Sequence, residues 1–127
     1  MLLKECYDSF GGSYETIMQR LPREETVKKF ALKFLSDPSF GDLRKALECG
    51  DYERAFLAAH SLKGVSSNLA FVQLSISSGE LTELLRDRES RIPDEESCRE
   101  LFERVTTDYE AVTKALMELE QNSEADV

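Results

Sequence analysis

Hydrophobic residues recur along the chain at intervals of three and four, and no segment alternates apolar and polar residues as a strand would. The set Val27, Phe30, Ala31, Phe34 and Leu35 is a clear example, because each step returns to the same face of a helix. The pattern therefore predicts an all-α protein. We expect helices over about residues 13–21, 22–35, 40–49, 51–70, 72–88 and 94–120.

Residues that favour helix ends stand at these predicted boundaries. Ser13, Asp51 and Asp94 can each accept a hydrogen bond from the first turn of the helix that follows. Pro22 suits a first helical turn, and Gly50 suits a left-handed C-cap. Because the connections are short, we expect neighbouring helices to run antiparallel.

The last four predicted helices should form an antiparallel up-and-down four-helix bundle, with the additional N-terminal helices packed against one end or side. A chain of this length is expected to be one domain, 1–127, helical over about 13–120 and followed by a polar tail, 121–127. We expect a loop at 87–93. The initial Met1 and the polar tail favour a free-standing unit.

The charge balance limits the partners. The chain has 16 Lys and Arg residues against 25 Asp and Glu residues, a formal net charge of −9. Phosphate backbones and anionic lipids would repel such a chain, so we expect no nucleic acid and no membrane partner. No apolar run is long enough to span a bilayer. We expect a cytoplasmic monomer.

The sequence contains few residue patterns that could bind a metal or a cofactor. Three widely spaced cysteines and one histidine do not form a zinc-binding pattern, and Cys98 lies on an apolar helix face. No glycine-rich phosphate loop, nucleotide-binding motif or cluster of magnesium-binding aspartates is visible. We therefore expect no metal and no cofactor on this chain, which leaves a stand-alone enzyme as the least favoured hypothesis.

The single histidine, His60, is predicted to project away from the core. At about 100° per residue, the core-facing Leu62 and Leu69 lie about 160° and about 180° from it around the helix. Gly64 and Ser67 lie within about 40° of it, one and two turns further on. The surface beside the imidazole is therefore bare, which indicates that a partner must approach it.

The surroundings of His60 suit phosphoryl transfer. Phe56 and Phe71 lie within about 40° of it at the two ends of this face, as a docking surface would require. An imidazole in water has a pKa of about 6.5 and is mostly neutral and nucleophilic at pH 7. Lys63 can supply positive charge to the phosphoryl oxygens. The phosphoryl donor and its metal would have to belong to another protein.

The segment "AAHSLKGVSSNLAF" resembles the motif of the histidine phosphotransfer (HPt) domain family. The resemblance implies that His60 is phosphorylated at Nε2, that Lys63 neighbours the phosphate, and that Gly64 and Ser67 are small residues that give a receiver domain access. It also implies a helical bundle that shuttles phosphoryl groups without hydrolysing ATP.

Two positions depart from the family pattern. Ala70 stands where the family usually has glycine, a change expected to tighten the helix junction. Many members place Gln or Glu on the following helix to orient the imidazole through Nδ1, and the matching residue here is Thr82, with Glu80 and Glu83 beside it. A weaker contact from the Thr82 hydroxyl is possible, and the identity of the orienting group stays open.

The resemblance thus implies a phosphoryl carrier of a two-component phosphorelay. His60 would accept a phosphoryl group from a receiver-domain aspartate or a sensor kinase and pass it to another receiver aspartate. Response-regulator receivers and hybrid sensor kinases are the implied partners, and Mg²⁺ is expected on the receiver. The alternative is a non-catalytic HPt-like module that binds receiver or kinase domains through the same Phe56 and Phe71 face.

Overall fold

The structure, a computed structural model, describes residues 1–87 and 93–125. Over these residues it contains seven α-helices, one short 3₁₀ helix and no strand, which confirms the all-α prediction. Most of the loop expected at 87–93, and the last two residues of the chain, lie outside the described residues. The elements are α1 (Leu3–Ser9), α2 (Tyr14–Arg20), α3 (Glu24–Lys33), η1 (Phe34–Ser36), α4 (Ser39–Glu48), α5 (Tyr52–Asn68), α6 (Val72–Arg86) and α7 (Glu95–Ala125).

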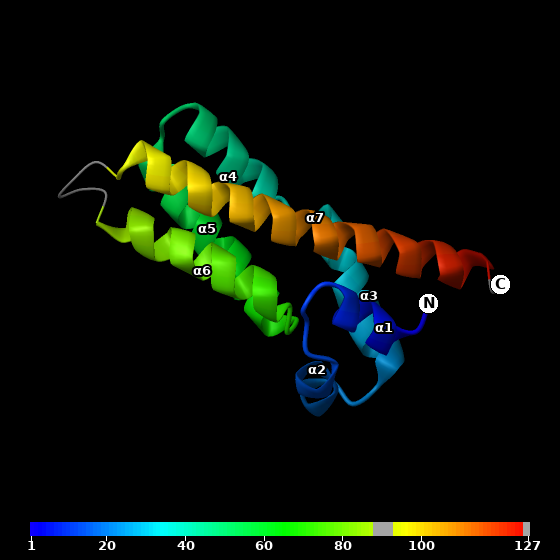
Figure 1. Cartoon of the computed structure of the whole chain (residues 1–127). Coiled ribbons are helices and arrows are strands. Elements are labelled where there is room, and N and C mark those ends of the chain that lie inside the picture. Colours follow the sequence, from blue (N-terminus) through cyan, green and yellow to red (C-terminus); the bar gives the residue numbers. More distant parts are fainter. Residues whose placement is uncertain (88–92, 126–127) are drawn as a thin grey trace.

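Helices α4 to α7 form the predicted four-helix bundle (Figure 1). Helix α5 packs against both α4 and α6, and α6 packs against α7. Between α4 and α7, the Phe40 ring stacks with the rings of Phe102 and Tyr109. The apolar faces of the four helices therefore enclose one core, which continues into the N-terminal part.

The N-terminal helices lie at the end of the bundle that carries the α5–α6 turn, beside the extended second half of α7 (Figure 1). An aromatic cluster joins the two parts: the Phe71 ring centroid lies 5.1–5.6 Å from those of Tyr7, Phe10 and Phe34. The Tyr7 hydroxyl donates a 2.8 Å hydrogen bond to the Leu69 carbonyl. The N-terminal part thus supports the end of the helix that carries the histidine.

Two helix limits differ from the prediction. Helix α1 was not predicted, because a seven-residue helix is too short to show a repeated period, yet Leu3, Cys6 and Tyr7 are buried. Helix α7 continues to Ala125 instead of ending near residue 120. No Gly or Pro follows Leu119, so nothing in the sequence stops the helix.

The predicted N-caps and the Gly50 C-cap are confirmed, whereas Pro22 lies just before α3, which begins at Glu24 with Arg23 as its N-cap. The side chains of Ser13, Asp51 and Asp94 each accept a hydrogen bond of 3.0–3.1 Å from a backbone N–H three residues further on. Gly50 has a φ of +70° and ends α4 in the left-handed conformation. Within the described residues, no helix combines the length and the apolar character that crossing a bilayer requires.

Candidate functional site

Helix α5 exposes His60 because its small and apolar residues gather on the opposite face. Asp51 caps the start of this helix, and the aromatic cluster holds its end. The imidazole therefore stands on a rigid base, exposed as the helical wheel predicted. The side chains that α5 buries are Ala55, Ala58, Ala59, Leu62 and Ser66.

The surface that follows His60 along α5 is bare. Gly64 is exposed, and a Cβ atom placed there would have no atom within 4 Å outside its own helix backbone. Ser67, one turn further, is exposed and carries only a hydroxymethyl group. The space above Gly64 is open to a second molecule, and the Arg20 guanidinium donates a 2.7 Å hydrogen bond to the Ser67 carbonyl.

Aromatic and charged groups flank the imidazole on the side of α6. The rings of His60 and Phe56 are stacked, with centroids 6.1 Å apart and planes 17° from parallel. The Arg86 guanidinium lies over the same phenyl ring, 5.4 Å from its centroid, and donates hydrogen bonds of 2.9–3.2 Å to the Glu83 carboxylate. These hydrogen bonds are the main reason why the pKa of Glu83 is lowered, and the positive charge of Lys63 lowers this pKa further.

The Lys63 side chain crosses toward α6. A Cβ atom built at Gly79 would lie 3.5 Å from both Cδ and Cε of Lys63, so the methylene stem lies over bare helix backbone. Both residues border a shallow hollow between the two helices. In the described part of the chain, no carboxylate lies within ion-pair distance of the Lys63 ammonium.

Phe71, which was predicted at the edge of this face, is fully buried, and its assignment to the docking surface is wrong. Helix α5 ends in a left-handed turn at Ala70, where φ is +59°. Hydrogen bonds from Phe71 N to Ser66 O (2.8 Å) and from Ala70 N to Ser67 O (3.1 Å) form a Schellman motif. Because the chain leaves the helix before Phe71, the helical wheel does not apply to that residue.

Thr82 also differs from the prediction. Its side chain is fully buried, and its hydroxyl donates a 2.7 Å hydrogen bond to the Ser78 carbonyl of the same helix. The Ser75 and Ser78 hydroxyls, predicted to share its polar stripe, likewise donate to carbonyls of α6. Thr82 therefore does not orient the imidazole. The neighbouring Glu83 is exposed.

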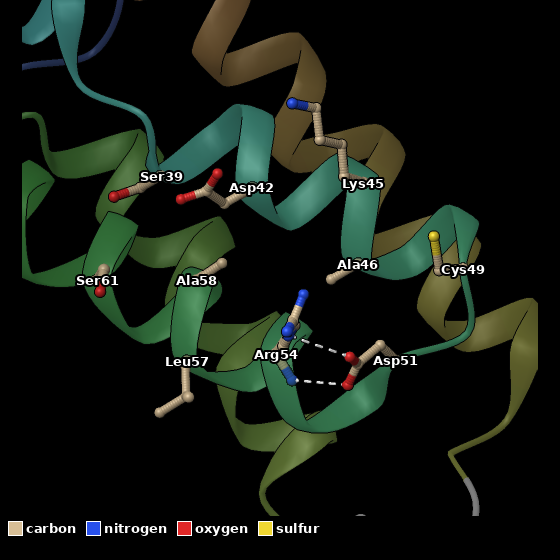
Figure 2. A pocket seen from close by; sticks show the side chains of 10 residues that line it. All are labelled: Ser39, Asp42, Lys45, Ala46, Cys49, Asp51, Arg54, Leu57, Ala58 and Ser61. Atoms are coloured by element: carbon tan, nitrogen blue, oxygen red, sulfur yellow. Dashed lines mark hydrogen bonds and ion pairs between the residues drawn. The ribbon is translucent and has the colours of Figure 1, made fainter.

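A groove between α4 and α5 borders the other side of the His60 face (Figure 2). From α5 it is lined by Leu57 and Ser61, which lie about 60° and about 100° from His60 around the helix. The Leu57 side chain is 57% exposed, so this edge of the face is apolar. At one end of the groove, Arg54 forms an ion pair with Asp51. The charged residues that line the groove are Asp42, Lys45, Asp51 and Arg54.

Arg86 and Gly79 were not predicted as parts of this site. They reach it because α5 and α6 run antiparallel. Phe56 on α5 faces Arg86 on α6, and Lys63, seven residues after Phe56, faces Gly79, seven residues before Arg86. That register follows from the left-handed turn between the helices. Hydrophobic periodicity gives the two faces but not the register, so only the turn geometry could have identified these residues.

The fold and the site together define a class of protein. It is a four-helix bundle that exposes one histidine, with a lysine three residues further along the same helix. The family profile of the Hpt domain matches residues 36–124, well over half of the chain and nearly all of the bundle. The chain belongs to the Hpt domain family, as the motif around His60 indicated.

Two curated relatives match part of this chain. Both carry the name Sensory/regulatory protein RpfC and come from two strains of Xanthomonas campestris pv. campestris. Each is 38% identical over 60 residues, which cover 46% of this chain and 8% of the relative, so the chain spans only a small part of these proteins. No solved structure matches significantly. Together the comparisons show a phosphotransfer module of two-component signalling.

Proposed function

We propose that this chain carries a phosphoryl group on His60. It accepts the group from a receiver-domain aspartate or a sensor kinase and passes it to another receiver aspartate. The observation that supports this most is the openness of the α5 face: His60 is exposed and Gly64 has no side chain to screen it. A partner's phosphorylated aspartate can thus approach the ring in line.

The chemistry follows from an exposed imidazole and a neighbouring cation. The Nε2 lone pair of His60 forms a bond to phosphorus while the P–O bond of the acyl phosphate breaks, and its electron pair leaves on the aspartate carboxylate. Lys63 offers positive charge to the phosphoryl oxygens. The reverse step delivers the group to the next receiver. We assign the chain no ATP-dependent kinase activity. We assign the Mg²⁺ that the transfer requires to the receiver domain.

The docking surface surrounds His60 on both helices. We include Phe56, Gly64 and Ser67 in this surface, and two exposed apolar residues extend it. Leu57 borders it toward α4, and Ile76, 49% exposed, borders it on α6. An apolar surface around a reactive group suits a partner that excludes water when it binds.

We further propose that the chain acts as a cytoplasmic monomer without a nucleic acid partner. The formal net charge of −9 opposes binding to phosphate backbones. The three cysteines, Cys6, Cys49 and Cys98, are free thiols, which is usual in a reducing compartment.

Incubation with receiver domains labelled on their aspartate, in the presence of Mg²⁺, tests the proposal. The native chain should take up label that is labile in acid and stable in alkali, and His60→Gln should take up none. Ser61→Ala, at the next exposed position, is the matched control and should label normally. Label on His60→Gln, or no labelling by any receiver from the source organism, would contradict the proposal.

The same experiment separates transfer from binding alone. If the chain were a non-catalytic module, the native chain and the His60→Ala variant would bind receivers equally well, and neither would take up label. Calorimetric titration of both forms with an unphosphorylated receiver gives this comparison directly.

A further inference from the structure

Gly79 on α6 has no conformational reason to be glycine. It lies inside a helix, where glycine is less favourable than alanine, and its φ is not in the left-handed region, unlike those of Gly11 and Gly50. A Cβ there would meet nothing closer than the Lys63 stem at 3.5 Å. Gly79 therefore leaves a patch of α6 without a side chain, here called the seat, against which the Lys63 methylenes lie.

The carboxylates around this seat already have cationic partners. Glu80 accepts a 2.5 Å hydrogen bond from Arg104, and Glu83 accepts its hydrogen bonds from Arg86. These carboxylates can attract the Lys63 ammonium, yet no ion pair captures it among the described residues. The lysine is thus held by its apolar stem, while its charged end stays available.

We propose that Gly79 is a positioning residue for Lys63: it seats the lysine stem so that the ammonium waits beside His60 for the phosphoryl group. This inference rests on the function proposed above. A lysine without a seat would have to order its flexible side chain during each transfer, and the seat removes part of that entropic cost.

Phosphoramidate is the probe that tests this positioning without a docked partner. With this donor, the Nε2 lone pair forms the N–P bond while the donor's own P–N bond breaks and its electron pair leaves on ammonia. Gly79→Ala is the control, because its Cβ would lie at ordinary contact distance from Lys63. Gly79→Gln fills the seat and displaces the lysine.

We expect Gly79→Ala to label at the native rate, and Gly79→Gln and Lys63→Ala to label about fivefold more slowly. In the Lys63→Ala background, Gly79→Gln should cause no further loss, because the two changes remove one interaction. A purely structural role for Gly79 would not give this non-additivity. Gly79→Gln at the native rate, or equally slowed without Lys63, would overturn the inference.

A second measurement keeps the test independent of the folding of Gly79→Gln. In the native protein, nuclear Overhauser contacts should join the Gly79 α protons to the Lys63 side-chain methylenes, and their absence would overturn the inference. Failure of the native chain to take label from both phosphoramidate and receivers would overturn the proposed function, and this inference with it. Normal labelling of the native chain, combined with a Gly79→Gln variant that labels at the native rate, would overturn the inference alone.

Discussion

At His60, the proposed phosphoryl transfer depends on the open space beside the imidazole as much as on the ring itself. Gly64 and Ser67 leave this space along α5, while Phe56 and Lys63 fill the side toward α6. In the proposed transfer, a partner would therefore meet the imidazole from solvent, with Lys63 one turn further along the same helix. The residues proposed for transfer and those proposed for access are in this way separate, and each can be changed alone.

Gly64→Gln tests access. The side chain would screen the imidazole, so the rate of transfer from a phosphorylated receiver should fall by about tenfold or more. The fold should not suffer, because the added Cβ has no neighbour within 4 Å. Helix propensity should even raise the free energy of unfolding by up to about 1 kcal/mol. Rapid-quench transfer assays and urea denaturation measure both effects, and an unchanged rate would contradict the assigned face.

The three thiols should differ in reactivity because their burial differs. Cys49 is exposed. Burial raises the pKa of the Cys98 thiol, and it raises the pKa of the Cys6 thiol to about 11. At pH 8 a disulfide reagent should therefore react quickly with one thiol per folded chain and with all three after denaturation. Rapid loss of two or three thiols from the folded chain would show that the buried cysteines are accessible.

At the scale of the helices, α5 fixes the histidine through its core face. Leu62 is fully buried two residues after His60. Leu62→Ala should lower the free energy of unfolding by about 2–5 kcal/mol through a cavity in the bundle. Urea denaturation compares this variant with Gly64→Gln on the same helix. Similar stabilities for the two variants would contradict the assigned orientation of α5.

The helix ends use the left-handed conformation twice, with different residues. Gly50 and Ala70 occupy equivalent positions in two Schellman motifs, at the ends of α4 and α5. An L-residue in that conformation costs about 1–2 kcal/mol, which explains why glycine is usual at position 70 in the family that this chain resembles.

Gly50→Ala measures that cost. Gly50 is exposed, and a Cβ there would have no neighbour within 4 Å, so the backbone conformation is the only penalty. The free energy of unfolding should fall by about 1 kcal/mol. Chemical denaturation gives the value, and an unchanged stability would mean that the turn can relax.

These elements also show how far the sequence could predict the site. The four bundle helices, the Ser13, Asp51 and Asp94 caps and the exposure of His60 depend on local sequence and were predicted correctly, whereas the short helix α1 was missed. Phe71 and Thr82 were misplaced because their surroundings depend on the left-handed turn at Ala70 and on the register that it sets between α5 and α6. The contact between Lys63 and Gly79 has the same origin. Periodicity carries no information on that register.

At the scale of the whole molecule, the N-terminal helices lie outside the matched family region yet share its core. Burial holds the pKa of Cys6 at about 11 and raises that of Tyr7 even further above its ordinary value. In the unfolded chain the Cys6 thiol loses its proton near its ordinary pKa of 9.0, well before it does in the folded chain. The stability that this thiol contributes is therefore complete below about pH 9 and is lost as the pH rises toward 11.

The free energy of unfolding should thus fall as the pH rises from 9 to 11. Cys6→Ala should flatten this fall, whereas Cys49→Ser should leave it unchanged because Cys49 is exposed. Urea denaturation at a series of pH values gives the slopes. Identical slopes for Cys6→Ala and the native chain would contradict the role of the buried thiol.

The central claim is that His60 receives the phosphoryl group. Digestion of the labelled protein in alkali, followed by mass spectrometry of the peptide that contains His60, tests it most directly. We predict one phosphoryl group on His60, lost in acid and absent from His60→Gln. A phosphoryl group on Ser61, Ser66 or Ser67 of the same peptide, stable in acid, would contradict it.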